Sequence, residues 1–584
     1  MNSAVPNIPR RQLYLARKGA LYTERSSFFS HWRDLSRFYL PRNGRFFISD
    51  RNKGDKRFNN IYDNTGTRAL RILAAGLMSG MTSPARPWFR LATRDKSLMD
   101  SNDVKLWLNN VTTLMRSIFN ESNTYRALHT MYEEIACFAT GASLITEDFE
   151  DVLRHYPLTV GEYALAINDR QEVCTMVREY EMTVSQIVSK YVQPDPRSKS
   201  GSLVWDNVSP QVKTLWDNGK GLDAWIPVIH IIEPRTDRDS TKRDAKNMPF
   251  ASCTFEAGGQ RGTDVFLNES GYKRFPVLTG RWAAQSGDVY GTTCPGMEAL
   301  GDVKQLQHGQ LRKSQGIDYM VKPPIQVPSG TKAYETDFLP GGVSVANMGG
   351  PNAGIKTAFD VRLDLSGQLE DIKDIRQRIG QTFYTDLFMM MAMDERAQPA
   401  TAREVAEKHE EKLLMLGPVL ERLHNELLKP FIDLAFDKMI EADIVPPPPP
   451  EMHGQDVDVQ FVSMLAQAQM AIGTQNIDRY VMAMGQIAAF KPDVTDKLDS
   501  DKWADRYADM LGVDPDLIVG GDGVAIIRDN RAKMQAQQAK AAQMQQAAET
   551  AKTASQADTG GQNALTDVMS GLTGYTGPGI ANAA

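Results

Sequence analysis

The stretch GTTCPGMEALGDVKQLQHGQLRKSQG, residues 291–316, decides how the middle of this chain folds. Pro295 stands near its beginning and Gly316 at its end, the positions where proline favours the start of a helix and glycine its stop. A segment rich in proline and glycine follows over residues 317–360 and predicts short strands and turns. The sequence therefore predicts a helix that leads into a small compact insert.

A second helix is predicted on the far side of the insert, over residues 361–388. Its apolar residues recur at steps of three, four or seven, as on the buried face of an amphipathic helix. They are Leu365, Leu369, Ile372, Ile379, Phe383, Leu387 and Met390. The stretch FMMMAMDERAQPAT then interrupts the helical pattern, so we expect a loop over residues 389–400. Two long helices would thus carry the insert at one end.

The longest helix is predicted within residues 401–445, where leucines mark one apolar seam. A kink is expected at Gly417 and Pro418, because proline lacks an N–H and its ring clashes with the carbonyl four residues earlier.

The chain changes character after this helix. PPPPP at 446–450 is a stiff polyproline spacer, and residues 456–515 have helical patterns again. From Arg531 the composition becomes Ala, Gln and Lys, which favours a helix with little apolar surface. The end, from about residue 556, is rich in Gly, Ala and Thr and is expected to be disordered.

Residues 1–290 predict an α+β body. An amphipathic helix is expected at 11–38, with its aromatic face packed and its arginine face solvated. Residues 1–60 hold 13 Lys and Arg against 4 Asp and Glu, so this segment could also bind nucleic acid or face an acidic neighbouring subunit. Helices are expected over 61–140. Strands are expected beyond 143, in a hairpin YALAIN-DRQ-EVCTMVREY, a buried strand VIHII and a second hairpin SCTFEAGGQRGTDVFL.

The composition bounds the class of protein. The chain has 584 residues, of which 42% are hydrophobic and 24% charged, and this excludes wholesale disorder. The net charge is -6, whereas a protein that grips nucleic acid tightly is normally basic overall. Its four cysteines lie far apart, which excludes a Cys-rich zinc site and a disulfide scaffold. We find no signal peptide and no stretch near the roughly 18 apolar residues of a membrane span, so no membrane partner is expected.

No motif demands an active site, and neither enzymatic activity nor a cofactor is expected. There is no GxxxxGK[ST] phosphate loop and no HExxH metal motif. GGPNAG at 349–354 is interpreted as a turn, and His409, His424 and His453 as structural or solvated residues. The stretch DSDKWADRYADM, from Asp499, lacks the glycine and glutamate of a calcium loop and is interpreted as helix capping.

The loop at 389–400 leaves two pairs of alternatives open. Asp394 and Glu395, beside Arg396, could hold a metal, but a solvated loop is favoured because no third acid lies nearby. Its methionines either pack at a helix end or form a flexible apolar tip exposed to a ligand or a channel. They are Met389, Met390, Met391 and Met393.

These segments, in this order, resemble the head-to-tail connector (portal) proteins of short-tailed bacteriophages. The likeness covers residues 60–530 and rests on five stretches. They are YDNTGTRALRILAAGLMSGMTSPARPWF (62–89), WLNNVTTLMRSIFNESN (107–123), YKRFPVLTGRW followed by YGTTCPGMEALGDVKQLQ (272–307), PATAREVAEKHEEKLLMLGPVLERLHNELLKPFI (399–432) and FVSMLAQAQMAI (461–472).

The resemblance implies an α+β, mainly helical fold with a wing, a two-helix stem, a small α/β clip and a helical crown. The segments would be 1–290 wing, 291–316 first stem helix, 317–360 clip, 361–388 second stem helix, 389–400 channel loop, 401–445 long kinked wing helix, 446–530 crown, and 531–584 Ala/Gln-rich helix and flexible tail.

In function, the resemblance implies a ring of identical subunits, typically twelve, at one vertex of the virion capsid. Double-stranded DNA would be packaged through it by a separate terminase motor and ejected through it into the tail. Other partners would be the major capsid, scaffolding and tail adaptor proteins, with assembly in the host cytoplasm. The alternatives are another virion structural protein, from the tail or the interior, and a nucleic-acid enzyme, which no motif supports.

Overall fold

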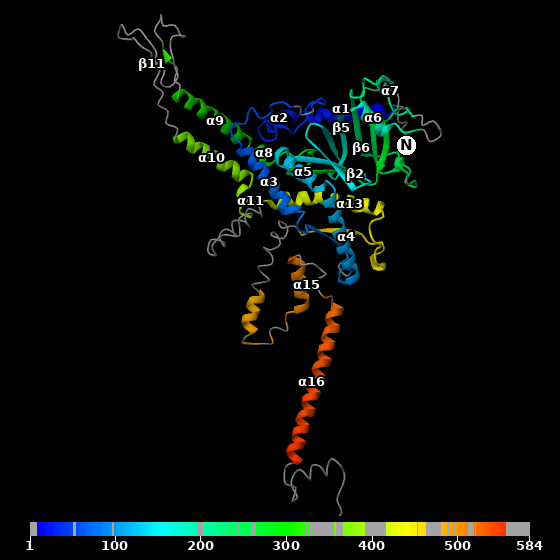
Figure 1. The fold of residues 1–584 in the computed structure, drawn as a ribbon, viewed down its shortest axis with the longest axis vertical. Coiled ribbons are helices and arrows are strands. Elements are labelled where there is room, and N and C mark those ends of the chain that lie inside the picture. Colours follow the sequence, from blue (N-terminus) through cyan, green and yellow to red (C-terminus); the bar gives the residue numbers. More distant parts are fainter. Residues whose placement is uncertain are drawn as a thin grey trace, which may run out of the picture. The chain divides into compact units, whose positions relative to one another are not determined.

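The computed structural model divides the chain into two units, Met1–Gly512 and Val513–Ala584 (Figure 1). The residues that it describes are 9–50, 54–95, 98–194, 203–242, 244–258, 264–321, 325–326, 356–357, 366–391, 416–452, 454–462, 480–488, 490–491, 493, 497–511, 519 and 521–555.

Helices make up most of the described chain. Those of the first unit are α1 (Arg10–Ser26), α2 (Phe29–Phe38), α3 (Thr65–Met81), α4 (Asn102–Glu121), α5 (Thr124–Phe138), α6 (Val184–Tyr191), α7 (Pro210–Asp217), α8 (Pro295–Glu298), α9 (Leu300–Val321), α10 (Ser366–Thr382), α11 (Thr385–Met391), α13 (Lys429–Glu441) and α15 (Ser500–Leu511). The second unit holds α16 (Gly521–Ser555). None of the described helices is both long enough and apolar enough to cross a bilayer.

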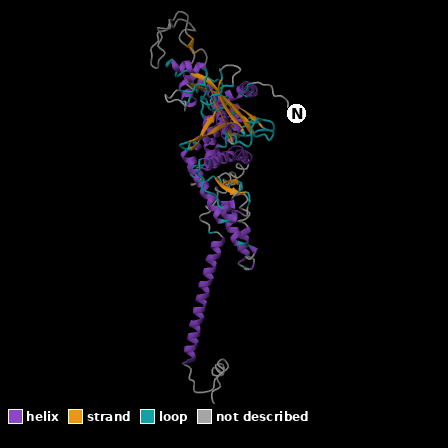
Figure 2. Ribbon diagram, turned by 90° about the vertical axis from the view of Figure 1, so that its right-hand side faces the viewer, coloured by secondary structure: helices purple, strands orange, loops and turns teal. Residues whose placement is uncertain are grey.

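The strands gather in the first unit (Figure 2). They are β1 (Phe89–Thr93), β2 (Thr140–Asp148), β3 (Val152–Leu158), β4 (Tyr163–Ile167), β5 (Val173–Thr183), β6 (Trp225–Pro234), β7 (Phe250–Glu256), β8 (Asn268–Tyr272), β9 (Val277–Arg281), β10 (Ile325–Gln326), β11 (Lys356–Thr357) and β12 (Val457–Phe461). They form an antiparallel five-stranded sheet β4-β5-β6-β7-β8, a three-stranded sheet β3-β2-β9, and the pairs β1-β12 and β10-β11. The predicted α+β class is therefore confirmed.

The five-stranded sheet is covered on both faces, because β6 has apolar residues at successive positions, which point to opposite faces of the sheet. Ile229 and Ile231 of β6 pack with Tyr14 and Leu21 of α1. Val228, on the opposite face of β6, packs in the cluster that α6 and α7 supply. The predicted hairpin β4–β5 and the buried strand β6 are confirmed. The second hairpin exists, but its return strand is β8, later than the predicted TDVFL.

The N-terminal segment departs from its prediction in two ways. The single helix expected at 11–38 is two helices, α1 and α2. Its arginine face is also not wholly solvated, since Arg11 and Arg25 are only 5% and 4% exposed. Their guanidinium groups donate to backbone carbonyls of the sheet, Arg11 to Glu256 at 2.6 Å and Arg25 to Tyr163 at 2.9 Å. These bonds to strand carbonyls compensate in part for the desolvation of the two cations, and burial still lowers the pKa of Arg11.

The main core joins α3, α4 and α5 to the three-stranded sheet and to α9, α10, α11 and α13. The predicted helices between 61 and 140 are confirmed, with Asn64 at the N-cap position of α3. Pro295 is the first residue of α8, as predicted. The following helix α9 does not stop at Gly316 but continues to Val321, just before the prolines at 323 and 324. An interior glycine costs a helix only about 1 kcal/mol, whereas proline ends it.

The helix predicted at 361–388 is interrupted. Residues 361–365 lie outside the described residues, α10 ends at Thr382, and Tyr384 adopts a positive φ of 52° before α11 begins. Because α11 runs to Met391, the residues Met389, Met390 and Met391 are helical and do not begin a loop as predicted.

The long helix is described from Leu416 onward, so the predicted kink at Gly417 and Pro418 lies at the limit of the described residues and stays a prediction. A different irregularity is present at His424–Leu428, which form a π-helical turn. The N–H of Lys429 donates to the carbonyl of His424, five residues earlier, and the next residue is Pro430, which has no N–H. A proline that cannot bond to the preceding turn accounts for such a local change of winding.

Part of the predicted crown belongs to the body. β12 pairs antiparallel with β1, from Phe89 with Phe461 to Thr93 with Val457, where the sequence had predicted helix. The letters VDVQF alternate apolar and polar residues, which is the period of a strand. In the second unit α16 is helical as predicted, although it begins at Gly521, and residues 556–584 lie outside the described residues.

Candidate functional site

The two helices α9 and α10 lie side by side and correspond to the predicted helix–insert–helix (Figure 1). Val303 and Leu306 of α9 and Ile372, Ile375 and Ile379 of α10 are buried between them and the body. An ion pair of 3.1 Å between Arg378 and Asp302 also joins the two helices. The insert between them is described only at β10 and β11, which pair antiparallel.

Asp63 fixes both helices to the body, and its side chain is only 4% exposed. Its Oδ2 accepts hydrogen bonds from Gln310 Nε2 at 2.9 Å and from Arg376 Nη2 at 2.7 Å. Gln307 Oε1 accepts from the backbone N–H groups of Tyr62 and Asp63, and its Nε2 donates to the Asp63 carbonyl. One aspartate therefore holds both helices beside the start of α3.

Ionisation of Asp63 is favoured despite its position. Burial acts to raise the pKa of this carboxyl, but the hydrogen bonds from Thr65 and Arg376 more than offset burial and lower the pKa. The carboxylate is therefore the form that holds α9 and α10 at neutral pH.

The far ends of the two helices expose apolar side chains. Beyond Gln307, none of the α9 side chains is buried. Ile317, Tyr319, Met320 and Val321 of α9 are 41%, 50%, 47% and 79% exposed, and Leu369 of α10 is 44% exposed. Such a run of exposed apolar residues is typical of a surface that another chain covers.

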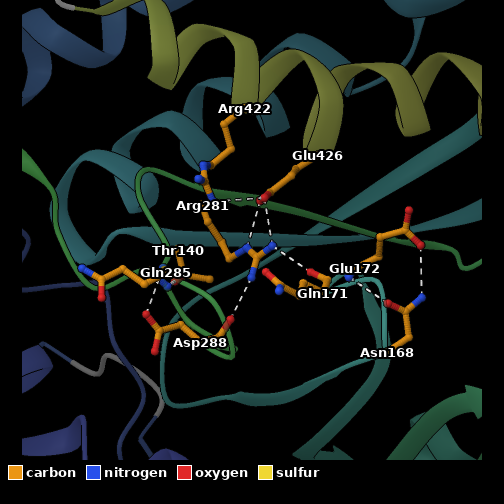
Figure 3. Close-up of polar contacts among 10 residues, drawn as sticks. Thr140, Asn168, Gln171, Glu172, Arg281, Gln285, Asp288, Arg422 and Glu426 are labelled. Atoms are coloured by element: carbon orange, nitrogen blue, oxygen red, sulfur yellow. Dashed lines mark hydrogen bonds and ion pairs between the residues drawn. The ribbon is translucent and has the colours of Figure 1, made fainter.

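A second polar cluster surrounds Arg281, the last residue of β9, whose side chain is 6% exposed (Figure 3). Its Nε and Nη2 donate to the two carboxylate oxygens of Glu426 at 2.9 and 2.8 Å. Its Nη1 donates to the Asp288 carbonyl at 2.9 Å and its Nη2 to the Gln171 carbonyl at 3.1 Å. Arg281 thus ties the sheet, two turns and the π-helical turn together through a bidentate ion pair.

A cavity of about 770 Å³ lies beside this cluster, between the Gln171 turn, β9 and the long helix. Its lining mixes both signs of charge with apolar side chains, among them Arg170, Arg274, Glu421, Arg422, Asp433 and Phe275. Arg274 itself pairs with Asp433 at 3.1 Å and Asp437 at 2.7 Å. Because its cations are balanced by neighbouring acids, the cavity does not by itself point to an anionic ligand.

The predicted channel residues are only partly within the described chain. Met389 is 39% exposed in the last turn of α11, while Met393, Asp394, Glu395 and Arg396 lie outside the described residues. The helix that carries Met389 is held against α3, because a Cβ added at Gly76 would lie 2.2 Å from the ring of Phe388. The position of α11 therefore depends on a glycine of α3.

The other sequence candidates have structural environments or are not described. His424 stacks on Phe461 with the ring centroids 4.2 Å apart, and burial lowers its pKa to about 4. His409, His453 and the turn at 349–354 lie outside the described residues. Asp499 caps α15 as predicted, because its Oδ1 accepts from the N–H of Lys502 at 3.2 Å. Within the described ranges, no group of three or more His, Cys, Asp or Glu residues is arranged to hold a metal ion.

Comparison with known proteins identifies the family. Residues 11–519 match the family described as "Bacteriophage head to tail connecting protein". The chain belongs to this family. The probable portal protein of Bordetella phage BPP-1 is 54% identical over 566 residues, which cover 97% of this chain and 99% of that protein. The portal protein of Salmonella phage epsilon15 is 44% identical over 531 residues, which cover 91% of this chain and 92% of that protein.

Solved structures give a weaker comparison. The virion of a native gene transfer agent particle contains a chain that is 10% identical with a TM-score of 0.30, covering 72% of this connector and 86% of that chain. The neck of an empty gene transfer agent particle gives 10% identity and a TM-score of 0.32, covering 76% and 92%. Scores this low carry no argument, so the family assignment rests on sequence.

Sequence reasoning missed the residues that hold the site together. Asp63 and Arg376 are 313 positions apart, and Arg281 and Glu426 are 145 positions apart. The sequence did carry one signal near them, since Pro430 stands within the long predicted helix just as Pro418 does. It marks the π-helical turn that presents Glu426 to Arg281.

Proposed function

We propose that this head-to-tail connecting protein is the portal of a phage, which closes into a ring of identical subunits at one capsid vertex. The observation that carries the proposal is the sequence relationship to two portal proteins, each covered over more than nine-tenths of its length. The exposed apolar ends of α9 and α10 support it, because a neighbouring subunit in a ring would cover them.

DNA would pass through the centre of this ring in both directions. A separate terminase motor would drive packaging, and tail adaptor proteins would dock later for ejection. The net charge of -6 suits a conduit, because each phosphate that a cation neutralises would add affinity and slow the passage of the duplex.

In this proposal each segment of the chain corresponds to one region of the portal. Helices α9 and α10 form the stem, the insert 317–360 forms the clip that meets terminase and adaptors, and residues 392–400, after α11, form the channel loop. The long helix belongs to the wing with residues 1–290, and so does β12, because it pairs with β1. The remainder up to residue 530 forms the crown.

Negative-stain microscopy of the purified protein tests the proposal. Rings with a central opening, built from about twelve copies, are the expected result. Rods or monomers would favour another virion structural protein, and metal-dependent cleavage of DNA by a monomer would favour an enzyme. Replacing residues 321–359 by a short Gly/Ser linker should leave rings intact and abolish terminase docking, whereas loss of the rings would make the insert an assembly element.

A further inference from the structure

Four exposed apolar side chains, three of them aromatic, lie on the segment after α2, within residues 42–50 and 54–62, which we name the basic loop. Phe47, Ile48, Phe58 and Tyr62 are 67%, 45%, 49% and 57% exposed. The guanidinium of Arg57 pairs with both carboxylate oxygens of Asp50, which joins the two halves of the loop. Large apolar side chains exposed within one short segment make it a candidate for contact with another protein.

The basic loop and the adjoining helix α2 are positively charged. Arg33, Arg37 and Lys56 are exposed and have no acidic partner among the described residues. The guanidinium carbon of Arg33 lies 5.5 Å from the ring centre of Phe46 and 5.7 Å from that of Phe47, so cation and aromatic surface are presented together. The surface therefore fits a partner that offers both acidic and aromatic groups.

The chain itself carries such a group at the tip of the β2–β3 hairpin, which reads Asp148, Phe149, Glu150, Asp151. Phe149 is fully exposed, at 106%, and the side chains of Glu150 and Asp151 have no partner among the described residues. The turn is well defined, because Asp148 Oδ1 accepts from the N–H of Glu150 at 2.9 Å. Asp148 also pairs with Arg154 at 3.4 Å, so the tip presents a large apolar ring followed by two carboxylates that have no partner among the described residues.

The tip and the basic loop lie at opposite ends of β3. The loop is bound at the far end, where the N–H of Arg45 donates to the Val160 carbonyl at 2.9 Å and that of Gly44 to Thr159 Oγ1 at 2.7 Å. The tip lies at the start of the strand, before Val152, and seven strand residues span about 20 Å. The tip therefore does not reach the anchored part of its own basic loop, at Gly44 and Arg45.

We propose that the Phe149 tip of one subunit docks on the basic loop of the next subunit. The inference rests on the proposed ring, since a contact between two different surfaces of one chain repeats from copy to copy and closes at a fixed rotation. Phe149 packs among Phe47, Phe58 and Tyr62, and the carboxylates of Glu150 and Asp151 face the cations of Arg37 and Lys56 of the neighbour.

Charge reversal on each side, and on both together, tests the contact. Glu150→Lys with Asp151→Lys, and Arg37→Glu with Lys56→Glu, should each raise the protein concentration needed for half-assembly about tenfold, measured by mass photometry and sedimentation. Combining the four changes should restore assembly, because the charges are then exchanged. The matched control is Asp217→Lys with Asp223→Lys, two exposed positions elsewhere, which should assemble as the unchanged protein does.

Cross-linking gives a second measurement that leaves the surface nearly intact. In a Cys174→Ser background, in which the other three native cysteines are buried, Glu150→Cys and Lys56→Cys are introduced together and treated with a short bismaleimide. A ladder of covalent oligomers is expected from the double variant and not from either single variant.

The outcomes separate this contact from the ring itself. Failure of the unchanged protein to form rings would contradict the proposed function. Normal rings from both reversal variants, with no cross-linked ladder, would overturn the contact and leave the portal proposal standing. Salt-dependent binding of a DNA duplex that is lost in Arg37→Glu with Lys56→Glu, without loss of assembly, would assign the basic loop to nucleic acid and also overturn the contact.

Discussion

Two ion pairs tie distant parts of this connector together, and they are built in opposite ways. At Arg281 and Glu426 the cation is the buried partner, with 6% of its side chain exposed against 24% for the acid. At Asp63 and Arg376 the acid is the buried partner, with 4% exposed against 47% for the cation.

The number of other hydrogen-bond partners that the buried residue has decides how much stability is lost when its counter-ion is removed. Glu426 is the one acidic side chain that the described residues show bonded to Arg281, so its removal would leave a buried cation without a counter-charge. Asp63 also accepts from Thr65 and Gln310, so it keeps donors when Arg376 is removed. The first pair should therefore be essential to the body, and the second should mainly adjust the position of α9 and α10.

The largest effect is expected for Glu426→Ala. It should lower the free energy of unfolding by about 3 kcal/mol, because Arg281 would stay buried with only backbone carbonyls as acceptors. Urea unfolding followed by tryptophan fluorescence measures the change. Glu421→Ala, at an exposed position on the same helix, should cost less than about 0.5 kcal/mol. Removing both charges, with Arg281→Met and Glu426→Leu, should recover most of the loss, and a double variant as unstable as Glu426→Ala would refute the explanation.

A smaller effect is expected for Gly76→Ala, which tests a contact between α3 and α11 that does not involve the Asp63 pair. The new Cβ would lie 2.2 Å from the ring of Phe388, so α11 must shift, at a cost of about 2 kcal/mol. The matched control is Gly19→Ala on α1, where nothing lies within 4 Å and stability should stay the same or rise. Equal melting temperatures for the two variants would mean that α11 is not held by this contact.

Arg376→Ala should cost only about 1 kcal/mol in the same measurement, since its guanidinium is half exposed and Asp63 keeps its other donors. Arg378→Ala, which removes two partly exposed ion pairs, one to Asp302 of α9 and one to Asp374 of α10, serves as the control and should cost no more than about 0.5 kcal/mol. A loss for Arg376→Ala as large as that for Glu426→Ala would abolish the contrast between the two pairs.

The smallest effect concerns pH. The pKa of Asp63 is lowered in the folded protein, so its charge stabilises the fold above the ordinary aspartate range, and this contribution is lost as the pH falls through the folded pKa. The difference in the free energy of unfolding between the unchanged protein and Asp63→Asn should reach its maximum near about pH 6 and should shrink below about pH 4. Asp217→Asn changes an exposed residue of α7, and its free energy of unfolding should differ little from that of the unchanged protein at every pH in this range. A difference for Asp63→Asn that does not change with pH would mean that ionisation of Asp63 is not what holds α9 and α10 to the body.

The sequence predicted those parts of the fold that short-range patterns encode. Helices α3, α4 and α5 and strands β4, β5 and β6 each carry their own apolar period, and each was located from it. The break at Tyr384 was missed because a single positive φ leaves no periodic signal. Strand β12 was missed because five residues with a strand pattern lie between a proline run and a helical pattern.

The candidate site was less predictable than the fold, for a physical reason. The helix–insert–helix could be found from spacing, but what fixes it is the pairing of Asp63 with Gln307, Gln310 and Arg376, which only the folded chain brings together. The channel loop was predicted where FMMMAMDERAQPAT interrupts the helical pattern, and Met389 to Met391 of that stretch proved to be helical. The roles of residues 392–400 therefore stay predictions.

The pairing of β1 with β12 has a consequence for synthesis on the ribosome. Phe89 is made about 370 residues before its partner Phe461, and translation at about 5–20 residues per second separates them by roughly 20 s or more. During that interval the nascent body carries an unpaired strand edge, which is open to pairing with any other chain. Truncated chains that stop before Val457 would keep this edge permanently, so they should aggregate in the cell even though most of the core has been synthesised.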